Sequence, residues 1–201
     1  MSVNEDHTVQ TTPAIADPAP LGLGAFALTT FLLSAVNAGW ATASTGDAWV
    51  GYAFAYGGLC QLLAGMWEFR NRNVFGATAF STYGGFWIGL GLWSQLVAPH
   101  ATGAGAAHDL GWILLAFAIF NTYMLIMAAQ VNLAVFAVFL TLELTEIVLF
   151  AGNFAVSDTT VKVGGYIGVI TALCAWYASA AGVANGIGGK LRLPVGAPLV
   201  A

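Results

Sequence analysis

The sequence predicts an all-α integral membrane protein with six transmembrane helices. Of the 201 residues, 59% are hydrophobic and only 7% are charged, whereas soluble domains carry about 25% charged residues. Polar breaks divide the chain into six stretches close to the length of about 20 apolar residues that a transmembrane helix needs. This composition excludes a soluble domain, and we expect a multi-pass protein of the cell membrane, surrounded by the lipid bilayer.

Six apolar stretches, each closed by polar residues or glycine, are the predicted spans. They cover residues 21–43, 48–67, 76–97, 110–128, 132–152 and 163–186. Residues 1–16 are polar, and we expect them to form a disordered tail ahead of a transmembrane domain over residues 17–190. Residues 191–201 are expected to form a short C-terminal tail.

The basic residues predict the orientation of the spans. Arg70 and Arg72 follow the second span, Lys190 and Arg192 follow the sixth, and only Lys162 falls on the opposite side. Because Lys and Arg favour cytoplasmic loops, this distribution predicts that both termini are cytoplasmic. The basic residues form no patch, so nucleic acid is not an expected partner.

Glycines recur inside the predicted spans at a spacing of four residues. Tight packing between helices is the expected role, and lining a path with bare backbone is the alternative. The pairs are Gly85/Gly89, Gly164/Gly168 and Gly182/Gly186.

The first span begins at a turn rich in proline. Pro18 and Pro20 fix φ and remove two N–H donors, and Gly22 lets other atoms approach the first helical turn. A helix that starts in this way presents N–H groups with partial positive charge, which suit a small carboxylate. We therefore expect the backbone of Leu21 to Leu23 to bind an anion.

Several motifs resemble, in order and in spacing, those of the acetate uptake transporter family. That family's N-P-A-P-L-G-L signature matches residues 17–23 except at Asp17, which stands where the family has Asn. The resemblance extends to Gly196. Further matching pieces are Tyr56-Gly57-Gly58, Gln61, Glu68, Tyr83-Gly84, Phe86-Trp87, Gly152-Asn153 and Leu193-Pro194-Val195-Gly196.

Asp17 departs from the signature in its hydrogen-bonding capacity. An ionised Asp accepts hydrogen bonds but donates none, whereas Asn does both. An aspartate here would cap the helix well but would repel a carboxylate unless it were protonated or paired. A plain N-cap and a substrate contact are both open for this residue.

The resemblance implies transport of acetate or related small monocarboxylates by a ring-shaped homo-oligomer, a hexamer. It also implies a hydrophobic constriction formed by Phe26, Tyr83 and Leu142. These residues lie five, seven and ten positions from the inner starts of spans one, three and five. At about 1.5 Å per residue their depths agree within roughly 8 Å, so they can form one ring.

Polar residues at helical spacing extend the predicted path. Thr30, Ser34 and Asn37 follow Phe26 along one face of the first span, and Asn121 and Asn153 are weaker candidates of the same kind. Such stripes either bond neighbouring helices or line a hydrated path. The residues predicted to contact substrate are Asp17, Pro18, Leu21, Gly22, Leu23, Thr30, Asn37, Gln61 and Glu68.

Glu143 and Glu146 stand in the middle of the fifth span without an intramembrane Lys or Arg. A charged side chain at that depth costs several kcal/mol, so such residues are usually functional or neutral. We expect one of the two to be protonated and to couple transport to protons. The alternative is a neutral, hydrogen-bonded Glu with no part in transport.

The sequence contains no recognisable nucleophile–base set, nucleotide-binding loop or metal-ligand spacing. We therefore expect neither an enzyme nor a bound metal or cofactor. A passive channel for small weak acids, or for their neutral forms, is the alternative within transport. A pigment-binding protein would require a buried Lys, and Lys162 lies at the edge of a span.

Overall fold

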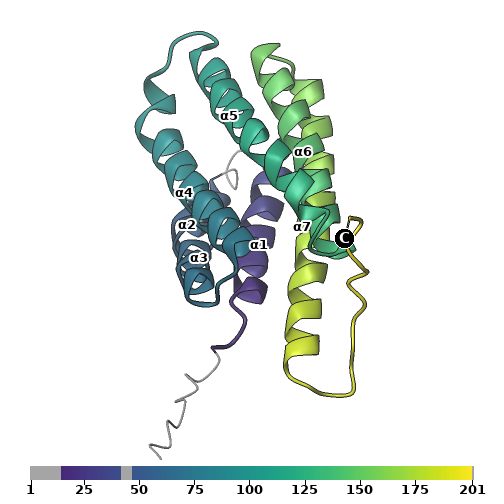
Figure 1. Cartoon of the computed structure of the whole chain (residues 1–201). Helices are drawn as coiled ribbons and strands as arrows, with labels where there is room; N and C mark the ends of the chain where they lie inside the picture. The colour runs from purple at the N-terminus through teal and green to yellow at the C-terminus, as the bar shows by residue number, and fades with distance from the viewer. Residues whose placement is uncertain (1–14, 42–46, 201) are drawn as a thin grey trace, which may run out of the picture.

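Six helical rods make up the computed structural model, which describes residues 15–41 and 47–200 (Figure 1). These residues contain no strand, so the all-α prediction is confirmed. The second rod consists of three consecutive segments, the middle one a π-helix. The elements are α1 (Ala19–Asn37), α2 (Ala48–Phe54), η1 (Ala55–Cys60), α3 (Gln61–Arg70), α4 (Val74–Leu96), the 3-10 turn η2 (Ala98–His100), α5 (Gly105–Ala128), α6 (Leu133–Phe154) and α7 (Asp158–Gly186).

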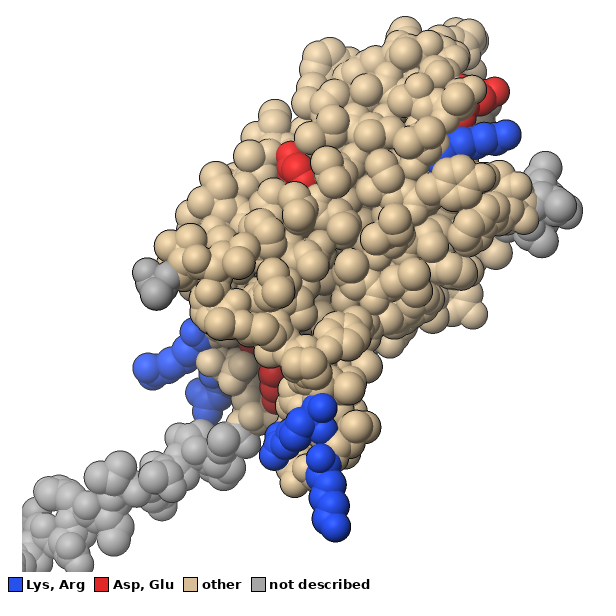
Figure 2. Space-filling view, turned by 90° about the vertical axis from the view of Figure 1, so that its right-hand side faces the viewer, with Lys and Arg blue, Asp and Glu red and all other residues tan. Residues whose placement is uncertain are grey.

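Four of the helices have the length and apolar composition of a membrane span, namely α1, α5, α6 and α7. Helix α4 is long enough, but glycine and hydroxyl residues dilute its apolar character. The second rod is divided into segments shorter than a span. On the face drawn in Figure 2, Lys and Arg lie at the two ends, and uncharged residues cover most of the middle.

Side-chain caps explain where several helices start. Asn73 Oδ1 accepts a hydrogen bond from Gly76 N, and Asn132 Oδ1 accepts one from Val135 N. Ser157 Oγ accepts from Thr160 N, and Asp158 adds a negative charge in the first turn. Helix α7 therefore starts five residues before the predicted span.

The first helix also differs from its predicted bounds of 21–43. It begins at Ala19, because Pro18 and Pro20 suit the first helical turn, where their missing N–H groups are not needed. It ends at Asn37, and the predicted end of the span lies outside the described residues, as do residues 1–14 of the predicted tail.

Helix α7 lies against both α1 and α6 (Figure 1). A Cβ on Gly165 would overlap the backbone of Asn37 and Ala38, and a Cβ on Gly164 would lie 2.7 Å from Leu149 Cγ. Glycine is thus required for these close approaches. Tight packing within the chain is not found for Gly85, Gly89 or Gly186, whose Cβ positions meet no atom within 4 Å.

Residues 191–200, here called the C-terminal strap, are packed along the bundle (Figure 1). The Asn185 side chain donates to the Leu193 carbonyl at 2.9 Å and accepts from the Leu193 N–H at 3.0 Å. Ala134 N donates to the Val195 carbonyl at 2.9 Å, which satisfies an N–H in the first turn of α6. Leu199 N donates to the Ala129 carbonyl at 2.8 Å, so the strap joins the ends of α5, α6 and α7.

The Asn185→Ala variant is expected to release the C-terminal strap. Alanine removes both side-chain hydrogen bonds to Leu193, at a cost of about 1–3 kcal/mol. We expect faster cleavage within residues 191–200 by subtilisin, followed by mass spectrometry, while the helices stay protected. The exposed neighbour Lys190→Ala serves as control, and equal cleavage of the two variants would contradict the role of Asn185.

Candidate functional site

Three neighbouring cavities lie inside the bundle. The first, called the large cavity, has a volume of about 520 Å³. It opens among the start of α1, the α3–α4 turn, the start of α6 and the end of α7. Its polar lining consists of Asp17, Asn71, Asn73, Asn132 and Asn185.

The other two cavities are much smaller and adjoin one another. The middle cavity, of about 20 Å³, shares lining residues with the large cavity, namely Leu23, Ala79, Phe80 and Phe139. The far cavity, of about 40 Å³, shares lining residues with the middle cavity, namely Phe26, Tyr83 and Leu142. The three cavities therefore follow one another through the bundle.

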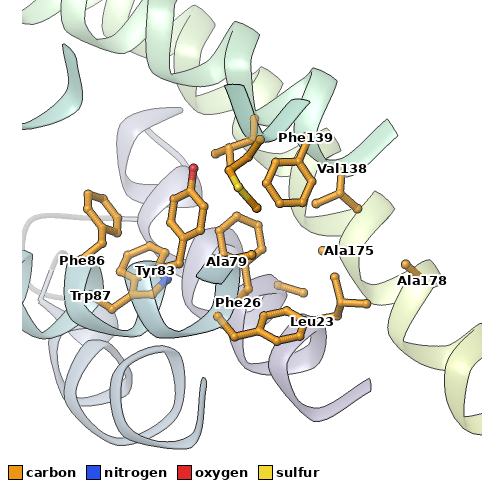
Figure 3. Packing of buried hydrophobic residues seen from close by; sticks show 14 of the residues in the cluster. Leu23, Phe26, Ala79, Tyr83, Phe86, Trp87, Val138, Phe139, Ala175 and Ala178 are labelled. Atoms are coloured by element: carbon orange, nitrogen blue, oxygen red, sulfur yellow. The ribbon is translucent and has the colours of Figure 1, made fainter. Parts of the chain in front are cut away.

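The residues between the middle and far cavities are the three predicted for a constriction. The structure brings Phe26, Tyr83 and Leu142 together from α1, α4 and α6, and we call them the neck. All three are buried, and the rings of Phe26 and Tyr83 meet edge to face with centroids 5.6 Å apart. Figure 3 shows Phe26 and Tyr83 within the apolar cluster that fills this region.

The aromatic neighbours of Tyr83 fix its ring. Phe86, Phe117 and Phe120 lie with ring centroids 6.2, 5.9 and 5.5 Å from that of Tyr83. An apolar neck of this kind strips hydration water from a solute, which is costly for an ion and cheap for a neutral molecule.

The residues predicted to contact substrate do not form one site. Asp17 and Leu23 line the large cavity, and Gln61 lines the middle cavity. Thr30 and Asn37 line the far cavity. The remaining residues, Pro18, Leu21, Gly22 and Glu68, line none of the three cavities.

The backbone of Leu21 to Leu23, where we predict an anion site, lies inside α1. The N–H groups of Leu21 and Gly22 donate to the Pro18 carbonyl at 3.1 and 3.2 Å. Because the helix starts two residues before the predicted span, these two groups are first-turn donors, and anion binding here stays a prediction. Gly22 also allows close packing, since a Cβ there would lie 2.7 Å from the Phe80 ring.

Asp17 and Glu68 make local hydrogen bonds near the large cavity. Asp17 Oδ1 accepts from Ala19 N at 2.9 Å, which is the geometry of a cap. Glu68 is fully buried, and its Oε2 accepts from Asn71 Nδ2 at 3.0 Å. Asp17 thus bonds the first turn of α1 from one residue ahead of its N-cap, Pro18, and its side chain also borders the large cavity.

Polar groups line the far cavity behind the neck. Thr30, Ser34 and Asn37 contribute from α1, and Thr145 and Glu146 contribute from α6. Thr30 Oγ1 and Glu146 Oε2 are buried without a hydrogen-bond partner. Buried polar atoms of this kind require a partner, so the lining is suited to water or to a small polar solute.

The structure separates the two glutamates of α6. Glu146 is 3% exposed, lines the far cavity and lies with Oε1 3.3 Å from the Tyr83 hydroxyl. Glu143 lines none of the cavities and bonds Asn121 and Thr122 on α5. Sequence reasoning ranked Asn121 low and missed Thr122, because neither residue signals its partners on another helix.

Comparison with known proteins supports a membrane transport setting. The model of the GPR1/FUN34/yaaH family matches residues 2–196. Acetate permease A of Emericella nidulans is 40% identical over 195 residues, which cover 90% of this chain and 65% of that protein. Accumulation of dyads protein 2 of Saccharomyces cerevisiae is 40% identical over 175 residues, with 85% and 62% covered. The chain thus spans just under two thirds of these longer fungal relatives.

Bacterial relatives match over nearly their whole length. The succinate-acetate/proton symporter SatP of Escherichia coli strain K12 is 32% identical over 182 residues, which cover 90% of this chain and 96% of that protein. The solved structure of the bacterial acetate channel SatP superposes with a TM-score of 0.84 at 32% identity, over 90% of this chain and 99% of the other. The chain is therefore a multi-pass membrane protein that belongs to the GPR1/FUN34/yaaH family.

Proposed function

We propose that this protein carries acetate or related small monocarboxylates across the cell membrane together with a proton, and that it is not an enzyme. The observation that carries the proposal is the sequence of three cavities interrupted by the apolar neck. The relatives named as acetate permease and succinate-acetate/proton symporter support the same chemistry.

The six helical rods would all cross the bilayer, with both chain termini in the cytoplasm. Helices α1, α5, α6 and α7 meet the criteria for a span by themselves. Because α4 and the second rod pack against α1, they would lie in the bilayer beside it. In this orientation the large cavity faces the cytoplasm and the far cavity faces outward. A homo-oligomer, a hexamer, would cover part of the apolar outer surface.

The neck favours passage of a neutral acid. A carboxylate that loses its water there pays a large desolvation cost, whereas the protonated acid pays little. Glu146 lies directly behind Tyr83 on the far side of the neck, where it can exchange a proton with a solute in the far cavity. Proton and carboxylate would therefore cross together.

A passive channel is the second candidate. The neck carries no charged side chain, and the solved relative is described as an acetate channel. A channel would conduct at a rate that does not saturate readily with acetate concentration and would show no uphill uptake.

Uptake of labelled acetate into proteoliposomes tests the proposal. Coupled transport predicts a saturable initial rate that rises with an imposed pH gradient, after subtraction of uptake by protein-free liposomes. A non-saturable rate that ignores the gradient would favour the channel. Uptake no faster than in protein-free liposomes would refute the function itself.

The Leu142→Ala variant is expected to widen the neck. The substitution removes three carbon atoms from the neck, which should admit the larger lactate molecule. The ratio of lactate uptake to acetate uptake should rise roughly tenfold, as expected for a small change in the size of a hydrophobic pocket. Competition for labelled uptake measures the ratio. Leu144→Ala removes the same atoms from a side chain that is 47% exposed on the outside of the same helix, and it should leave the ratio unchanged.

A further inference from the structure

One chain of hydrogen bonds connects the neck to both carboxyl groups of α6. The Tyr83 hydroxyl lies 3.1 Å from Asn121 Oδ1 and 3.3 Å from Glu146 Oε1. Asn121 Nδ2 donates to Glu143 Oε2 at 2.7 Å. The Thr122 hydroxyl lies 2.8 Å from Glu143 Oε1. The chain thus begins in the neck and ends between α5 and α6.

Counting donors at Tyr83 assigns a proton to Glu146. Asn121 Nδ2 also donates to the Phe139 carbonyl at 3.0 Å, which sets the amide so that its oxygen faces Tyr83. An amide oxygen only accepts, so the single O–H of Tyr83 must serve it. The second contact of Tyr83 becomes a hydrogen bond only if Glu146 donates to the phenol oxygen, as a neutral carboxylic acid does.

Thr122 on α5 contacts both its own helix and Glu143. The Thr122 hydroxyl lies 2.8 Å from the Ala118 carbonyl and 2.8 Å from Glu143 Oε1. A hydroxyl carries one proton, so it donates to one of these two oxygens at a time. Both bonds exist together when Glu143 donates through Oε1 while its Oε2 accepts from Asn121.

Within residues 15–41 and 47–200, no Lys or Arg lines the far cavity or bonds either carboxyl. Residues 73–161 contain no Lys or Arg. The titratable groups near Glu146 are Tyr83 on α4 and Glu143 on α6 itself, and Tyr123 on α5 lies near Tyr83. From α1 and α7 the far cavity and its wall receive only hydroxyl and amide groups, contributed by Thr30, Ser34, Asn37 and Thr171.

We propose that Tyr83, Asn121, Glu143 and Glu146 form a proton-operated switch in the neck, an inference that rests on the function proposed above. With Glu146 protonated, the Tyr83 O–H points to Asn121, as in the structure. When the Glu146 O–H bond breaks, its proton passes to a water molecule or carboxylate in the far cavity, which Glu146 lines. The Tyr83 O–H then turns to the new carboxylate, and Asn121 Oδ1 loses its donor.

Asn121 acts in this switch as a positioning residue, because it is fully buried and lines none of the cavities. Because Tyr83 donates its O–H to Asn121, Glu146 can bond Tyr83 only as a protonated, donating carboxyl group. The proton on Glu146 thereby sets the hydrogen bonds of one of the three neck residues.

Infrared spectroscopy of the purified full-length protein over a range of pH tests the switch. Glu146→Gln should remove part of the band of protonated carboxyl groups. In Asn121→Leu, Tyr83 is free to donate to Glu146, and this hydrogen bond stabilises the Glu146 carboxylate. The part of the band that belongs to protonated Glu146 should therefore be lost at a pH about one unit lower than in the wild type. Asn153→Leu is the matched control, since that buried amide bonds only its own helix, and it should cause no shift.

Tyr83→Phe keeps the ring in the neck and supplies two further readouts. The Glu146 O–H loses its acceptor, so its carboxyl band should move to higher frequency. In this background Asn121→Leu should cause no additional shift with pH, because the coupling runs through the Tyr83 hydroxyl. The frequency shift in Tyr83→Phe tests the switch even if Asn121→Leu does not fold.

Three results would overturn the switch: a carboxyl band that Glu146→Gln leaves intact, an Asn121→Leu shift that persists without the Tyr83 hydroxyl, or a Glu146 band that Tyr83→Phe leaves unchanged. Failure of the proposed function is a separate outcome. It would appear as absent acetate uptake by the wild type, whatever the infrared spectra show.

Discussion

Gly165→Ala is expected to abolish the folded protein. The new Cβ would overlap the Ala38 backbone nitrogen and lie 2.7 Å from the Asn37 carbonyl carbon. A backbone cannot move aside as a flexible side chain does, and Ala38 is itself only 4% exposed. We expect a loss of about 3 kcal/mol or more, seen as a collapse in the yield of monodisperse protein on size exclusion.

Gly85→Ala and Gly89→Ala are the matched controls for this substitution. A Cβ at either position meets no atom within 4 Å, and alanine is favoured over glycine in a helix by about 1 kcal/mol. Both variants should purify as well as the wild type and unfold at an equal or higher temperature. If Gly165→Ala behaves in the same way, the close contact between α7 and the end of α1 is wrong.

Glu146→Gln is expected to uncouple acetate uptake from the pH gradient. The amide can donate to the Tyr83 oxygen in place of the acid, so the neck should keep its shape, but no proton can leave. In the wild type the occupancy of a titrating group changes up to about tenfold per pH unit. The variant should retain uptake of neutral acetic acid down its gradient, with an initial rate that follows only the bulk concentration of that acid and lacks the further gain from a proton exchanged at Glu146.

Glu143→Gln provides the comparison on the same helix. Glu143 lines none of the cavities, so a proton on it cannot pass directly to a solute there. We expect this variant to keep the response to the gradient. Initial rates in proteoliposomes at several imposed gradients measure both variants, and a wild-type response in Glu146→Gln would exclude Glu146 as the coupling group.

Much of the fold follows from hydropathy and helix caps, and the exceptions have clear causes. Asn73 and Asn132 cap α4 and α6, and the predicted spans start within two residues of these helices. The start of α7 was missed because Ser157 and Asp158 are polar. A span predicted from hydropathy begins at the first apolar residues, which follow this polar first turn. The C-terminal strap was missed because an extended segment held by backbone carbonyls has no periodic pattern.

The candidate site was only partly predictable for a related reason. The depths of Phe26, Tyr83 and Leu142 follow from helix geometry, so their meeting could be anticipated. The partners of Asn121 could not be, because Tyr83 and Phe139 lie 38 and 18 residues away in sequence. The bonds that Leu21 and Gly22 make at the first turn could not be predicted either, because both depend on the position of one carbonyl, that of Pro18.

The contact between α1 and α7 has a consequence for the order of assembly. The first helix meets its main partner only when the last helix has been synthesised, since Gly165 and Gly168 pack against the second half of α1. Until then the hydroxyl of Ser34, which lies against Gly168, faces lipid or a temporary neighbour inside the insertion machinery. Ribosome-arrested chains that end before α7 should therefore leave α1 open to crosslinking, and extension through α7 should close it.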